Sequence, residues 1–79
     1  MGFHKRWITE EVLIDKYRRG GIEEIKSYLG HADAFVMNDD LSSDVIDLFN
    51  SSDIDEIKKW NLISEKISAR SIKLWNFNK

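Results

Sequence analysis

The sequence predicts a mainly α fold, a small compact bundle of four or five short helices in a single domain covering residues 1–79. Three observations predict it. Apolar residues recur every three or four positions along most of the chain, which is the spacing of an amphipathic helix. Serine, threonine or aspartate followed by carboxylates, a helix-start pattern, occurs several times. Glycine follows two of the expected helices, and proline is absent.

The first helix is expected to follow Thr9, which can act as its N-cap, and to run to Arg19 with Glu10 and Glu11 in its first turn. Gly20 can then take the left-handed conformation that closes a helix. A second short helix is expected over residues 22–29. The tight Gly-Gly joint would make the pair a helical hairpin.

The middle of the chain is harder to interpret. Residues 34–37 (Ala-Phe-Val-Met) are compatible with either a helical turn or a short strand, and the Asn-Asp-Asp that follows is typical of a turn. A third helix is expected over about residues 43–50, starting at Ser43. It would bury the apolar side chains that lie between its aspartates.

The C-terminal part carries the longest helical pattern. Ser52 is a candidate N-cap for a helix over residues 53–65, and a second segment over 68–76 is expected after a break within 67–71. The alternative is an α+β fold. In it, residues 71–77 form a strand that pairs with 34–37 in a short two-stranded sheet.

Composition limits the classes of protein to consider. Apolar residues make up 42% of the chain, which is enough for a folded core, and cysteine is absent, so disulfides and thiolate metal sites are excluded. No apolar run exceeds four residues, so the sequence predicts neither a membrane span nor a signal peptide. We therefore expect a cytoplasmic protein that does not act at a membrane.

The charges fall into three blocks. Residues 1–19 carry net +2, residues 20–57 net −9 and residues 58–79 net +5, which gives the overall −2. The basic ends could fold over the acidic middle and neutralise it, or the surface could keep two faces of opposite sign. In the second case an acidic surface would bind a basic surface of another protein through Asp39, Asp40, Asp44, Asp47 and Asp53.

Reactive motifs are missing from the sequence. The aspartates near position 40 lack the EF-hand pattern, and His4 and His31 are isolated, so no metal site or other cofactor is expected. No nucleophile motif or phosphate-binding loop occurs, and 79 residues leave little room for an enclosed pocket. The chain is therefore interpreted as not an enzyme.

Residues 67–75 support a different class of function. They resemble the opening of a recognition helix in a helix-turn-helix protein, with core residues at Ile67, Ile72 and Trp75. The resemblance implies DNA binding through Ser68, Ala69, Arg70 and Lys73. Upstream, Lys66 stands where the motif has its turn glycine, and the net negative charge opposes phosphate attraction.

The aromatic residues and the small size favour a binding protein. Trp60 is expected in the core, while Phe3, Trp7 and Phe77 either pack together over the bundle, which we favour, or serve as exposed anchors. The predicted function is a small non-catalytic regulator or inhibitor that binds another protein, with a homodimer as a further option. Abundant isoleucine, lysine and asparagine suggest an AT-rich genome, such as that of a phage or mobile element.

Overall fold

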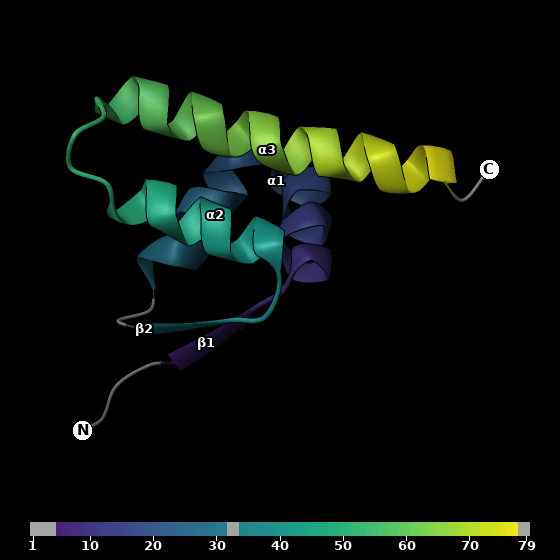
Figure 1. Ribbon diagram of the computed structural model, residues 1–79, viewed down its shortest axis with the longest axis horizontal. Helices are drawn as coiled ribbons and strands as arrows, with labels where there is room; N and C mark the ends of the chain where they lie inside the picture. Colours follow the sequence, from purple (N-terminus) through teal and green to yellow (C-terminus); the bar gives the residue numbers. More distant parts are fainter. Residues whose placement is uncertain (1–4, 32–33, 78–79) are drawn as a thin grey trace.

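The computed structural model describes residues 5–31 and 34–77, and most of them are helical. The elements follow one another as β1 (Lys5–Ile8), α1 (Glu10–Gly30), β2 (Ala34–Met37), α2 (Asp40–Asn50) and α3 (Glu56–Phe77), as Figure 1 shows. The mainly α prediction is confirmed. The described residues form three helices rather than four or five, together with a small sheet.

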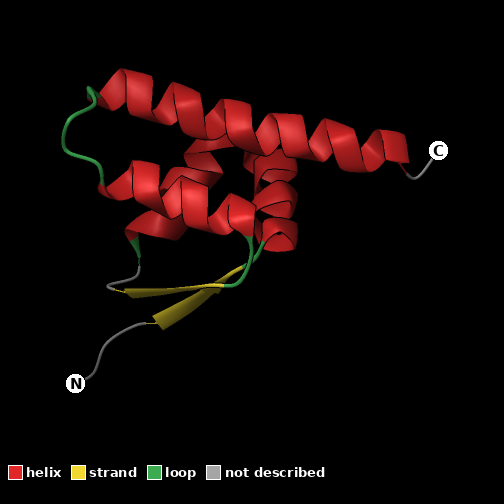
Figure 2. Cartoon of the chain, in the orientation of Figure 1, coloured by secondary structure: helices red, strands yellow, loops and turns green. Residues whose placement is uncertain are grey.

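The sheet consists of two parallel strands, and α1 lies between them in the sequence. β1 and β2 pair in the register Lys5↔Ala34 to Ile8↔Met37, with α1 as the crossover connection that parallel strands require. The strand that the α+β alternative placed at 34–37 is thus present. The partner given in that alternative was wrong, because residues 71–77 belong to α3 and residues 5–8 take that place. All three helices lie on one side of the sheet (Figure 2).

α1 begins as the sequence predicts and bends in its middle. The Thr9 hydroxyl accepts a hydrogen bond from the Val12 amide at 3.2 Å. At Gly21 the backbone has φ 68° and ψ −154°, a conformation that favours glycine, and the two arms of the helix run in different directions (Figure 1). The change of direction was expected at the Gly-Gly pair, but the positive φ falls at Gly21 and not at Gly20.

The turn before α2 is held by a carboxylate with two partners. Oδ1 of Asp39 accepts from the Ser42 amide at 2.8 Å, which makes Asp39 the N-cap of α2. Oδ2 of Asp39 accepts from the Glu10 amide at 2.7 Å, at the first residue of α1. One side chain therefore caps two helices. Because Asp39 provides the cap, α2 begins at Asp40, earlier than the expected start at Ser43.

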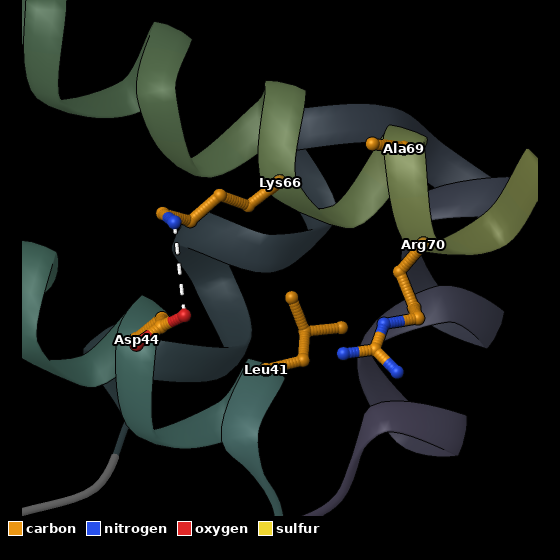
Figure 3. Close-up of a pocket in the computed structure, with 5 residues that line it drawn as sticks. All are labelled: Leu41, Asp44, Lys66, Ala69 and Arg70. Atoms are coloured by element: carbon orange, nitrogen blue, oxygen red, sulfur yellow. Dashed lines mark ion pairs between the residues drawn. The ribbon is translucent and has the colours of Figure 1, made fainter. Parts of the chain in front are cut away.

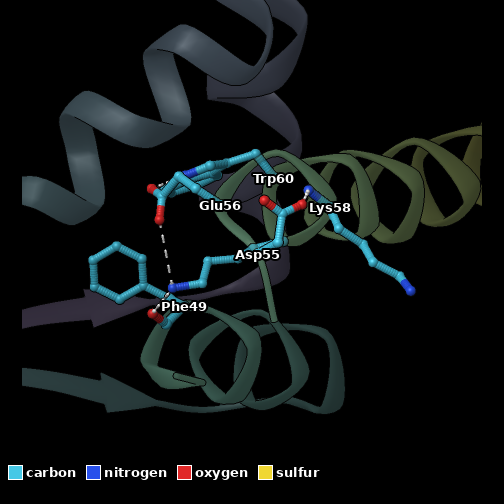
Figure 4. A network of polar contacts seen from close by, with 6 residues as sticks. Phe49, Asp55, Glu56, Lys58 and Trp60 are labelled. Atoms are coloured by element: carbon cyan, nitrogen blue, oxygen red, sulfur yellow. Dashed lines mark hydrogen bonds and ion pairs between the residues drawn. The ribbon is translucent and has the colours of Figure 1, made fainter. Parts of the chain in front are cut away.

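α3 begins at Glu56, later than the expected residue 53, because Asp55 and not Ser52 caps it. The Asp55 carboxylate accepts from the Lys58 amide at 3.2 Å. In the same turn the Trp60 indole donates to Glu56 at 2.8 Å (Figure 4). The Trp60 ring also packs edge-on against the Phe49 ring, with 5.8 Å between the ring centroids, and this contact joins the start of α3 to the end of α2.

α3 then continues to Phe77 without the break expected within 67–71. Serines on its α1 side are occupied by contacts between the helices. Ser64 shares a 2.7 Å hydrogen bond with the Tyr17 hydroxyl, and Ser71 accepts from Nε of Arg18 at 3.3 Å. The segment contains neither glycine nor proline, so nothing in its sequence strongly interrupts a helix. The two contacts with α1 stabilise this helix further.

The core lies between the three helices and β1. Trp60 is only 8% exposed, as expected for a core residue. Ile57, in the first turn of α3, is 73% exposed. Every element except β2 contributes to the buried apolar cluster, which consists of Ile8, Leu13, Ile14, Ile25, Leu29, Leu41, Val45, Ile46, Trp60, Ile63 and Ile67.

Candidate interaction surfaces

Asp39 is positioned for structure rather than for a partner. Its carboxylate is half-buried between α1 and α2, where both oxygens accept backbone amides. Burial raises the pKa of Asp39, but the amide hydrogen bonds from Ser42 and Glu10, together with the nearby Arg70 charge, outweigh it and lower the pKa overall. The negative charge of Asp39 is thus already used by the fold.

The other predicted aspartates of α2 form an exposed line. Asp40, Asp44 and Asp47 lie at i, i+4 and i+7, so they share one face of the helix, and all three are exposed. We call these three residues the acidic stripe. Asp44 lies 3.6 Å from Nζ of Lys66, whereas no described cation pairs with Asp40 or Asp47. Asp53 is also exposed, in the loop that follows α2.

A shallow hollow lies between α2 and α3 (Figure 3). It has a volume of about 250 Å³ and is lined by Leu41, Asp44, Lys66, Ala69 and Arg70. Both cations are engaged, Lys66 with Asp44 and Arg70 with Glu10 at 3.2 Å. The hollow is smaller than most ligand pockets, and its charges are already compensated. It therefore offers no strong site for an anionic ligand.

The residues proposed to face DNA lie on the last part of α3. Ser68 and Arg70 are half-buried, and the side chain of Lys73 lies outside the described part of the structure. The resemblance places the turn of the motif at Lys66, but α3 runs unbroken from Glu56 to Phe77. Residues 56–65 and 67–75 therefore form one continuous helix, and not the two helices joined by a turn that the resemblance implies.

The sheet carries a surface that sequence reasoning missed. Trp7 was expected to pack with Phe3 and Phe77, but its side chain is 65% exposed on β1, on the side of the sheet away from the helices. Phe3 and the side chain of Phe77 lie outside the described residues. Val36, the register partner of Trp7, is half-buried. The β-forming residues Trp7 and Ile8 just before the Thr9 cap were the available signal for a strand.

Metal-binding groups, membrane-spanning helices and similarity to known proteins would be further indications of function. Within residues 5–31 and 34–77, no group of three or more histidines, aspartates or glutamates is placed to hold a metal ion. None of the described helices combines the length and apolarity needed to cross a membrane. No protein-family model matches the sequence, and the comparisons with curated proteins and with solved structures found no match.

Proposed function

We propose that this chain is a small non-catalytic cytoplasmic regulator or inhibitor that binds a basic surface of another protein through the acidic stripe of α2. The observation that carries the proposal is the line of three exposed carboxylates, two of which lack a cation partner among the described residues. The composition, rich in isoleucine, lysine and asparagine, supports a phage or mobile-element origin.

The charge blocks neutralise one another only in part. Arg70 of the basic C-terminal block pairs with Glu10, and Lys66 pairs with Asp44 in the acidic middle. Asp40 and Asp47 stay open to solvent at the two ends of the stripe, about 10 Å apart along the helix axis. Carboxylates fixed on a rigid helix can steer a basic partner and set its orientation.

The test is capture of partners from lysate of the source cells by the tagged full chain. Replacing Asp40 and Asp47 with asparagine should strongly reduce capture of the partner, and the remaining capture should become less sensitive to salt. The matched control replaces Glu11 and Glu65 with glutamine, because both are exposed and the change in net charge is the same. Equal capture by the two double variants would rule out the stripe as the binding surface.

DNA binding through residues 67–75 is the second proposal, and the structure supports it less. Arg70 would have to leave Glu10, so DNA binding would lose the small stabilisation that this partly exposed ion pair gives the free chain. A fluorescence anisotropy titration with duplex DNA at low salt separates the two proposals. Binding with a steep salt dependence that Arg70→Ala reduces would favour DNA, and nuclease treatment would then abolish capture from lysate.

A further inference from the structure

The two-stranded sheet has two outer edges, and one of them is open. In any β-ladder alternate residues point their N–H and C=O groups away from the paired strand. For β2, none of the hydrogen bonds formed among the described residues reaches that outer edge. Within residues 5–31 and 34–77, the outward amides and carbonyls of Ala34–Met37 therefore have no partner and can accept another strand.

The outer edge of β1 differs from that of β2. The Trp7 carbonyl accepts a hydrogen bond from the Tyr28 hydroxyl at 3.0 Å, and two of the four β1 residues, Lys5 and Arg6, are positively charged. Charged residues on an edge strand discourage pairing with another chain. β2 has the uncharged apolar sequence Ala-Phe-Val-Met, with neither a charge nor a proline. Only β2 has the features of an edge that accepts a further strand.

We propose that β2 pairs antiparallel with β2 of a second copy of this chain, giving a four-stranded sheet in the order β1–β2–β2–β1. In a symmetric pair the two-fold axis passes beside one residue of β2, so that this residue faces its own copy. Such a register brings like side chains together. For β2 this costs no charge repulsion, whereas the sequence of β1 contains two positively charged residues.

The second copy also explains how so small a sheet is completed. A two-stranded sheet is marginal by itself, and three or more strands are usually needed for stability. A two-fold axis perpendicular to the sheet keeps the helices of both copies on the same face. It leaves β1, with its charged residues, at both outer edges. The assembly therefore closes at two chains and does not extend into a fibre.

Pairing of four residues buries little surface, so the expected dimer is weak, with a dissociation constant on the order of micromolar or above. The proposal does not rest on the acidic stripe. β2 and α2 are separate elements, and the dimer and the protein partner are tested by different variants. A chain that dimerises without binding a partner protein would refute only the proposed function, and a chain that binds a partner without dimerising would refute only the β2 pairing.

The test is sedimentation of the full chain from about 5 to 500 μM, combined with amide hydrogen exchange at both extremes. We expect the mass to rise toward twice the 9.3 kDa of one chain. We also expect slower exchange of the β2 amides at high concentration, with the β1 amides unchanged. A mass that stays at one chain, or a dimer whose β2 amides exchange at the same rate as in the monomer, would overturn the proposal.

Matched variants locate the interface. Val36→Lys places a charge at or next to the two-fold axis, and the dimer dissociation constant should rise at least about tenfold. Trp7→Lys adds the same charge on the same face of the sheet, one strand away, and should leave the constant within about twofold. Equal effects of the two substitutions would exclude pairing through β2. If Val36→Lys does not fold, the exchange measurement on the unmodified chain decides.

Discussion

Asp39→Ala removes two helix caps at once, and we expect it to lower the free energy of unfolding by about 2 kcal/mol. Losing the bond from the Ser42 amide, an N-cap, costs about 1 kcal/mol. Losing the bond from the Glu10 amide costs about 1 kcal/mol more, since the site is half-buried and water replaces the carboxylate only in part. For a domain of 79 residues this corresponds to a fall in Tm of about 8–16 °C.

Two further variants test whether Asp39 caps both helices. Asp39→Asn keeps one acceptor oxygen and loses the other along with the charge, so its cost should be about half that of alanine, near 1 kcal/mol. Asp40→Ala is the control, because the Asp40 carboxylate is exposed and interacts only with the dipole of α2. Its loss should cost about 0.5 kcal/mol. Urea and thermal unfolding give these values. Equal costs for Asp39→Ala and Asp40→Ala would refute the shared cap.

The same carboxylate should make stability depend on acid. Its pKa is lowered in the folded protein, so its contribution is fully present above the unfolded value of about 3.9. The contribution is lost as pH falls through the lower folded value, because the carboxylate must then take up a proton. The stability difference between the unmodified chain and Asp39→Asn should therefore shrink as pH falls from about 5 to 2. A constant difference over that range would contradict the assignment.

Further substitutions at Gly21, Tyr17 and Ile67, with Gly30 and Ser64 as comparison sites, test the packing by urea unfolding. Gly21→Ala should cost about 1–3 kcal/mol because of its positive φ, whereas Gly30→Ala, where the added methyl meets nothing within 4 Å, should be neutral or slightly stabilising. Tyr17→Phe should cost about 1 kcal/mol, and much less when Ser64 is already alanine; additive costs would mean that the 2.7 Å bond does not form. Ile67→Ala should cost about 2–5 kcal/mol because the side chain is fully buried, and a loss below 1 kcal/mol would contradict its place in the core.

The sequence predicted those features of the fold that depend on residues close together in the chain. Thr9 with its following glutamates marked the start of α1, and the Gly-Gly pair marked its bend. Both depend on backbone groups within a few residues, which the sequence displays directly. The bend could be assigned to the pair but not to Gly21 itself, because either glycine could adopt the positive φ.

Contacts between distant residues explain what the sequence did not reveal. β1 has four residues and becomes a strand only through a partner 29 positions away, so periodicity could not identify it. Asp39 was interpreted as a surface residue for the same reason, since the Glu10 amide that it accepts is also 29 positions away. The break expected within 67–71 does not occur. Ser71 of that segment, and Ser64 before it, instead hold α3 against α1.

Among the predicted site residues, Asp44 and Asp47 were expected on a helix, but Asp40 was expected in the turn before it. The three form one stripe only because α2 begins at Asp40. The sequence did not reveal this early start. It could not show that Lys66 lies beside Asp44, or that Arg70, assigned to DNA in the alternative reading, instead lies beside Glu10. Ion pairs between helices depend on packing, which the sequence pattern does not specify.

The position of α3 in the chain has a consequence for biosynthesis. α3 supplies Trp60, Ile63 and Ile67 to the interior, and the ribosome makes it after every other element. Until it emerges, the apolar faces of α1 and α2 have nothing to cover them, so the nascent polypeptide exposes surface that chaperones bind and proteases attack. Cooperative folding must therefore wait until translation has passed α3.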